Sequence, residues 1–348
     1  MAQSTTAPAL YARHELSFRT QFAELAERTR NEGKLLPGTP GSLALRSGTG
    51  QGYWYRRFYV EANRQVEDLV CKDGDEAALD AMRARIEFAA WAERQVRALR
   101  QLGFQVADRE VDRVLVELFN RNLFAAGLAL VGTLAYMAWL NELGVRAVTA
   151  RTQDVDLARR QALELAAPLS FMQAVQATRL RFVAVPGLAR GSASTSVKRP
   201  GRESLRIDVL APGRQLGQAV ALPELQWHAQ TVPHLDYLLG EPRSASVLAG
   251  GHCIPVLVPA PERFVWHKLY SSASRPQDRA KAGKDLLQAA TLLAALVEDD
   301  DLRWAESAGD VPAAVFAAAR SRRPALRRLL AAHPRALEEV ERALASGA

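Results

Sequence analysis

Two segments of this chain, roughly fifty residues apart, each place carboxylates on one face of a predicted strand. The first, TQDVDLA, carries Asp154 and Asp156, and the second, LRIDVL, carries Asp208. Side chains of an extended strand alternate between its faces, so Asp154 and Asp156 point away from Val155 and Leu157. If the two strands pair, three carboxylates meet, and they repel one another unless a hard cation such as Mg²⁺ holds them. The pattern therefore predicts a metal site.

A glycine turn precedes the first carboxylate strand. The apolar run LALV changes to the helical pattern LAYMAWLNEL at Gly132 and Thr133, which predicts a strand entering a helix. The first backbone N–H groups of a helix attract anions, so a triphosphate fits there. A lone DxD or Gly-Thr is usually structural, but chance rarely assembles this ordered set.

In these motifs the chain resembles the nucleotidyltransferases of the DNA polymerase β superfamily, in which a glycine turn and helix are followed by DxD and a third Asp. It is most similar to bacterial nucleotidyltransferase-fold proteins related to abortive-infection toxins. Those proteins add a Lys and then a Lys-Asp pair, matched here by Lys268 and Lys284-Asp285. The gap between Thr133 and Asp154 is longer than usual, and a short strand at Val145–Val148 would absorb the extra length.

The resemblance implies an α+β fold, with a small mixed β-sheet as the nucleotidyltransferase core and helical regions on either side. Three units are expected. Residues 1–107 would form an N-terminal arm with a β-hairpin and helices, residues 108–260 the catalytic core, and residues 261–348 a C-terminal helical region.

The resemblance also implies a Mg²⁺-dependent enzyme that moves a nucleoside monophosphate from a nucleoside triphosphate to a hydroxyl acceptor and releases pyrophosphate. Asp154, Asp156 and Asp208 would be catalytic and would bind the metal. The expected nucleotide-binding residues are Gly132, Thr133, Arg206, Lys268, Lys284 and Asp285. The acceptor stays open among nucleic acids, proteins and small molecules. The alternative is a nucleotide-binding module without turnover, or the toxin of a two-gene system.

Composition favours a cytoplasmic enzyme. The chain has 348 residues, 48% of them hydrophobic, which suffices for two or three cores. Cys71 and Cys253 lie far apart without a CxxC pattern, which argues against a disulfide framework or a structural zinc site. The first residues lack the apolar core of a signal peptide. The uncharged run Leu123–Leu140 has the length of a membrane helix, but glycines interrupt it, so a buried strand, turn and helix is favoured.

The first part of the chain predicts helices around a hairpin. Helices are expected at Leu16–Arg30, between Asp75 and Gly103, and from Asp108 to Ala126. Residues 43–60 predict two strands around a Gly-rich turn, in which aromatic residues alternate with arginines. Such a strip can stack nucleic-acid bases, although a half-buried strand with solvated arginines is the favoured interpretation.

Basic residues gather in the connections near Asp208. Strands are expected in RFVAV, STSVK and LRIDVL between residues 181 and 210, and a later strand in HCIPVLVPAP. The basic residues of this region are Arg190, Lys198, Arg199, Arg202 and Arg206. A basic rim would neutralise triphosphate or attract nucleic acid, whereas the competing interpretation is ordinary charged loops. The histidines at 228, 234 and 252 lack metal-ligand spacing.

Helices are expected from Pro261 onward. In KAGKDLLQ the polar residues Lys281, Lys284, Asp285 and Gln288 share one helical face, opposite the leucines, and could meet a ligand or simply be solvated. The run ARSRRPALRRLLAAHPRAL is basic and the net charge is +7, so a nucleic-acid partner fits the charge.

Overall fold

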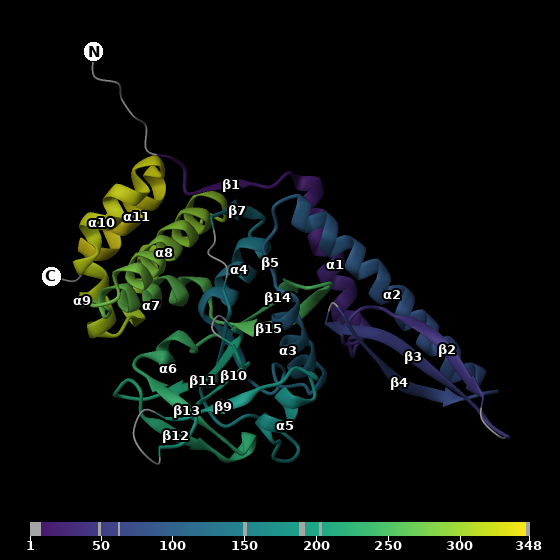
Figure 1. The fold of residues 1–348 in the computed structure, drawn as a ribbon. Coiled ribbons are helices and arrows are strands. Elements are labelled where there is room, and N and C mark those ends of the chain that lie inside the picture. Colours follow the sequence, from purple (N-terminus) through teal and green to yellow (C-terminus); the bar gives the residue numbers. More distant parts are fainter. Residues whose placement is uncertain are drawn as a thin grey trace.

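The computed structural model describes residues 8–47, 50–61, 63–148, 152–187, 192–201 and 204–345. These residues adopt the predicted α+β fold, with a mixed central sheet and helical flanks (Figure 1). The predicted division at residues 107 and 260 stays a prediction.

The central sheet has seven strands and branches at β11 (Arg206–Pro212). On one edge of β11, β8 (Asp154–Ala158) pairs in parallel, and β6 (Ala129–Val131) pairs antiparallel with β8. The opposite edge carries β10 (Ser196–Lys198) and β13 (Trp227–Val232), with β9 (Val183–Val185) and β12 (Ala219–Leu222) beyond them. Strand β11 therefore pairs with three strands, β8, β10 and β13.

The buried face of this sheet carries aliphatic side chains. Val155 and Leu157 of β8 and Ile207 and Val209 of β11 are fully buried. Burying one such side chain contributes about 1.5–3 kcal/mol. A shift of one residue in either strand would exchange these side chains for carboxylates such as Asp156, so burial fixes the register.

The predicted strand-to-helix turn is present. Helix α4 (Gly132–Glu142) begins directly after β6, so the run from Leu123 to Leu140 is not one continuous helix. Among the residues that the structure describes, no helix combines the length and apolar character needed to cross a bilayer. The expected short strand is β7 (Val145–Ala147), which pairs with β1 (Tyr11–Arg13).

Helix ends in the N-terminal part follow local signals. Helix α1 spans Leu16–Glu32, and α2 spans Glu76–Gln101, where Asp75 accepts a hydrogen bond from the backbone N–H of Ala78. The predicted helix from residue 108 to 126 is too long, because α3 (Arg109–Asn120) stops before Asn122, whose φ of 59° leaves the helical region.

The predicted hairpin is part of a three-stranded sheet. Strands β2 (Ser42–Ser47), β3 (Gly52–Glu61) and β4 (Arg64–Lys72) pair antiparallel, and β4 was not predicted. The sheet lies beside α2, on the side of the molecule away from the C-terminal helices (Figure 1). The prediction of solvated arginines is wrong for Arg56, which is 2% exposed and donates to backbone carbonyls.

The remaining elements complete the flanks. A third sheet joins β5 (Val106–Ala107), β14 (Arg243–Ala249) and β15 (His252–Val258). Of these, β15 is the strand expected in HCIPVLVPAP. The later helices are α5 (Phe171–Gln176), α6 (Leu235–Leu238), α7 (Pro261–Ala273), α8 (Arg279–Asp299), α9 (Ala313–Ser321), α10 (Arg323–Leu329) and α11 (Pro334–Ala345).

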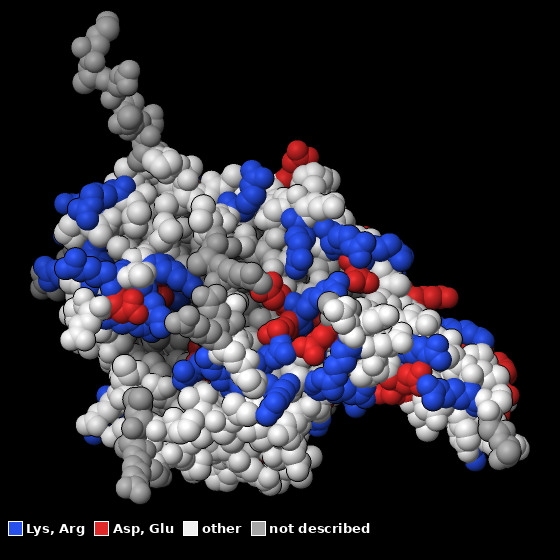
Figure 2. Space-filling view, in the orientation of Figure 1, with Lys and Arg blue, Asp and Glu red and all other residues white. Residues whose placement is uncertain are grey.

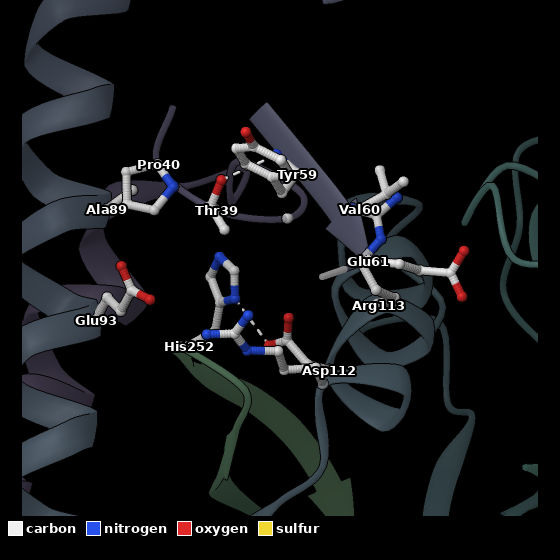
Figure 3. Close-up of a pocket in the computed structure, with 13 residues that line it drawn as sticks. Thr39, Pro40, Tyr59, Val60, Glu61, Ala89, Glu93, Asp112, Arg113 and His252 are labelled. Atoms are coloured by element: carbon white, nitrogen blue, oxygen red, sulfur yellow. Dashed lines mark hydrogen bonds and ion pairs between the residues drawn. The ribbon is translucent and has the colours of Figure 1, made fainter. Parts of the chain in front are cut away.

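A buried ion pair between β15 and α3 also contacts the N-terminal segment. Nδ1 of His252 lies 2.7 Å from Oδ1 of Asp112 on α3, and Nε2 lies 2.9 Å from the carbonyl oxygen of Leu36. The pair lines a solvent-open pocket between α2, α3 and β3 (Figure 3). Both oxygens only accept hydrogen bonds, so an imidazolium satisfies both contacts. Burial opposes the charge, but Asp112 and the Leu36 carbonyl together raise the pKa of His252.

We expect Asp112→Asn to lower the free energy of unfolding by about 3 kcal/mol, because His252 loses its buried counter-charge. Because the pKa of His252 is higher in the folded than in the unfolded state, its charge stabilises the fold fully at a pH below the unfolded pKa of about 6.5. This stabilisation is lost as the pH rises through the folded pKa. We would measure the free energy of unfolding in urea between pH 5.5 and 9. It should fall more with rising pH in wild type and in the exposed control Asp80→Asn than in Asp112→Asn. Identical pH profiles would contradict this role.

Candidate active site

Strands β8 and β11 bring the three predicted carboxylates to one side of the sheet. The register places Asp208 opposite Asp156, and Arg206 opposite Asp154. Residues two apart on a strand, and residues directly opposite on its neighbour, share a face. All three carboxylates line one solvent-open cleft of about 1430 Å³, together with the start of α4 and parts of α7 and α8.

The electrostatics of the cleft centre on Asp156. Burial, and then the charges of Asp208 and Asp154, raise the pKa of Asp156 to about 6. At neutral pH this carboxylate is mostly ionised, at a cost in stability that a positive partner would reduce. The donor set is hard oxygen, which suits Mg²⁺.

Gly132 lets this carboxylate approach the start of α4. A Cβ at Gly132 would lie 2.1 Å from Oδ2 of Asp156, and the φ of Gly132 is +68°. Both conditions require glycine. The neighbouring Thr133 is buried and also lines the cleft. The start of α4, predicted to bind phosphates, and the carboxylates thus line the same cleft.

Opposite the carboxylates, α7 and α8 form a cationic wall. Lys268 of α7 and Lys281 and Lys284 of α8 line the cleft, as does Arg275 just after α7. Burial, and then Lys268, lower the pKa of Lys284. Cations that crowd one another in this way favour an anionic ligand.

Asp285 holds part of this wall in place. Its carboxylate accepts from Lys268 Nζ at 2.7 Å and from Arg275 Nη1 at 2.6 Å. Asp285, which was expected to bind nucleotide, also lines the cleft and contacts two of its cations, and nucleotide binding by Asp285 stays a prediction. Gln288, expected on the same face, is buried and is not among the residues lining the cleft.

Arg206 contacts a carboxylate. Its Nε lies 2.8 Å from Asp208 Oδ1 and its Nη2 lies 2.8 Å from Ser196 Oγ, while the Ser196 hydroxyl donates to the same Oδ1. Across the described residues, no group of three or more His, Cys, Asp or Glu side chains is arranged to hold a metal ion. The metal role of the three carboxylates therefore stays a prediction, as does nucleotide binding by Arg206.

Of the five residues of the expected basic rim, Arg206 lines the cleft and Arg199 does not. Arg190 and Arg202 lie outside the described residues. Arg199 pairs with Glu61 and Glu110, toward the N-terminal sheet. In the C-terminal run, Arg323 and Arg327 both pair with Glu341. Figure 2 accordingly shows basic and acidic side chains intermixed on the visible face.

Several cleft residues were missed by the sequence analysis. An apolar part of the wall comes from Leu210, Leu216, Val232, Leu235, Leu238 and Phe264, and polar groups come from Thr152, Gln230, His267 and Ser271. Burial, and then Lys268, lower the pKa of His267 to about 4, so its ring is neutral at pH 7. The spacing of Phe264, His267, Lys268 and Ser271 along one face of a helix was the available signal.

The Asp156 pKa predicts the pH dependence of stability in the metal-free protein. The unfolded carboxyl has a pKa of about 3.8 and the folded one about 6, so stability falls as the pH rises between these values. In EDTA at pH 7.5, Asp156→Asn should be more stable than wild type by about 3 kcal/mol, and by less than about 1 kcal/mol at pH 4. Asp80→Asn is the control. A gain of the same size at pH 4 would contradict the electrostatic explanation.

Comparison with known proteins places the chain in a family. A family model described as nucleotidyltransferase matches residues 109–311, more than half of the chain. No protein of curated function matches. One matching solved structure is the antibiotic-resistance factor ANT(2'')-Ia, with 20% identity, coverage of 63% of this chain and 93% of that chain, and a TM-score of 0.31, which is too low to support conclusions. The match over residues 109–311 shows that the chain belongs to the nucleotidyltransferase family.

Proposed function

We propose that this nucleotidyltransferase is of the DNA polymerase β type, related to the abortive-infection branch, and depends on Mg²⁺. It moves a nucleoside monophosphate from a nucleoside triphosphate to a hydroxyl acceptor and releases pyrophosphate. The observation that carries the proposal is the single cleft in which Asp154, Asp156 and Asp208 face the lysines of α7 and α8.

The cationic wall supports the binding of a triphosphate. Lys268, Lys281, Lys284 and Arg275 offer positive charge to the phosphates, and the start of α4 at Gly132 offers backbone N–H groups. Lys268 and Arg275 are held by Asp285, so they are oriented before the substrate arrives. Preorganised charge of this kind stabilises the transition state more than mobile charge does.

Asp154, Asp156 and Asp208 would hold Mg²⁺, which when bound neutralises phosphate charge and polarises the acceptor hydroxyl. We assign Asp208 the further role of accepting the acceptor's proton, because it lies opposite Asp156 and lines the cleft. The acceptor oxygen then bonds to the α-phosphorus. The bond from that phosphorus to the bridging oxygen breaks, and pyrophosphate leaves with its electron pair.

A cytoplasmic location is part of the proposal. Cys71 and Cys253 are unpaired and buried, which fits a reducing compartment.

The second candidate is a nucleotide-binding module without turnover, or the toxin of a two-gene system. The Arg206–Asp208 ion pair favours it, because this contact occupies the carboxylate that would have to serve the metal and the acceptor.

We expect Asp154→Ala to reduce transfer at least about a hundredfold and to leave the fold intact, because Asp154 lies at an exposed position of β8 and not in the core. The measurement combines Mg²⁺, each α-labelled nucleoside triphosphate, and separate pools of RNA, protein and small-molecule acceptors, and follows label transfer and pyrophosphate.

The matched control is Asp80→Ala, an exposed aspartate on α2 that should keep full activity. Nucleotide binding by the wild type without pyrophosphate release in any pool would favour the module over the enzyme.

A further inference from the structure

The sheet formed by β2, β3 and β4 has one buried face and one open face. Arg56, Phe58 and Val60 of β3 point to the buried side. The residues that alternate with them, Tyr53, Tyr55, Arg57 and Tyr59, point to the open side. The structure thus separates the aromatic and basic positions that alternate in the sequence.

The strand register extends this open face across the sheet. Tyr53 lies between Arg46 and Lys72, and Tyr55 between Ala44 and Leu69. Arg57 lies between Ser42 and Glu67, and Tyr59 lies opposite Gln65. We call this set of residues, from Ser42 to Lys72 on the open side, the tyrosine face.

The tyrosine face exposes aromatic and aliphatic surface to solvent. Leu69 is 60% exposed and Tyr59 is 44% exposed. Tyr53 and Tyr55 are half-buried, and the guanidinium of Arg46 lies 5.7 Å from the ring centroid of Tyr55. Exposed aromatic surface with no covering element marks an interaction site more often than a solvated sheet.

The charge of the tyrosine face is positive. It carries Arg46, Arg57 and Lys72, and Glu67 lies beside the two arginines. Both arginines lie within 2.8 Å of Glu67, so one positive charge of that group remains uncompensated and Lys72 adds another. The face therefore complements a polyanion.

The ring spacing fits a single strand of nucleic acid. Tyr53 and Tyr55 are two residues apart on β3, a repeat of about 6.6 to 6.8 Å, and Tyr59 lies four residues after Tyr55. Each tyrosine can therefore take its own base, while arginine and lysine beside the rings meet the phosphates. Duplex bases are stacked on one another and do not present their faces in this way.

We propose that the tyrosine face binds single-stranded nucleic acid by stacking bases on Tyr53, Tyr55 and Tyr59, with Arg46 and Lys72 contacting phosphates. This goes beyond the proposed function, because binding here needs neither nucleotide nor catalysis. If the chain also has transferase activity, binding at this face indicates that the acceptor is a single-stranded nucleic acid.

The test is fluorescence anisotropy with a labelled single-stranded 20-mer of RNA or DNA and the full chain, without nucleoside triphosphate. Tyr55→Ala and Tyr59→Ala should each weaken binding by about fivefold to a hundredfold, whereas Tyr55→Phe should bind like wild type because the ring remains. Arg46→Glu should weaken binding and reduce the slope of log K against log salt by at least about 0.7. Leu45→Ala, on the opposite face of β2, is the control and should change little.

Equal binding by wild type and the Tyr→Ala variants, no binding of single strands, or preference for a duplex of the same sequence would each overturn the proposal. The two proposals also fail separately. Loss of oligonucleotide binding in Tyr55→Ala with pyrophosphate release from a small acceptor retained would leave the transferase intact. Binding that persists in Asp154→Ala without any transfer in wild type would leave the tyrosine face intact.

Discussion

The parallel pairing of β8 with β11 is the constraint on which the candidate site depends. It holds Asp156 opposite Asp208 although burial, and then the neighbouring carboxylates, raise the pKa of Asp156 to about 6. A shift of roughly two pKa units costs about 3 kcal/mol at neutral pH. The four aliphatic side chains buried beneath the pair contribute about 1.5–3 kcal/mol each. Burial on one face therefore outweighs the cost of holding Asp156 beside Asp208 on the other.

Local patterns in the sequence were enough to predict the elements that build this cluster. Alternation in DVDL and RIDVL gave the parity of Asp154, Asp156 and Asp208, because a strand with one buried face has a period of two. The change of pattern at Gly132 gave the start of α4, and helical spacing between Asp75 and Gly103 gave α2. These features depend on neighbouring residues only.

Features that depend on distant partners were not predictable. Strands β4, β12, β13 and β14 lacked a clear period. Ser196 and Arg206 meet Asp208 because β10 and β11 pair, and Arg275 meets Asp285 because the turn after α7 folds back on α8. The sequence showed aromatic and basic residues in β3, but only pairing with β2 and β4 shows which of them share the open face. Long-range pairing decides such contacts, and one sequence does not encode it in a local pattern.

The central claim is that the carboxylates of β8 and β11 hold the divalent cation of a nucleotidyltransferase. Its most direct test is a crystal structure with Mn²⁺ and a non-hydrolysable nucleoside triphosphate, in which anomalous scattering locates the metal. We predict a Mn²⁺ peak about 2.0–2.3 Å from carboxylate oxygens of Asp154 and Asp156, with the phosphates toward Lys268 and Lys284. A bound nucleotide with Mn²⁺ elsewhere, and with no peak at these two aspartates, would contradict the account.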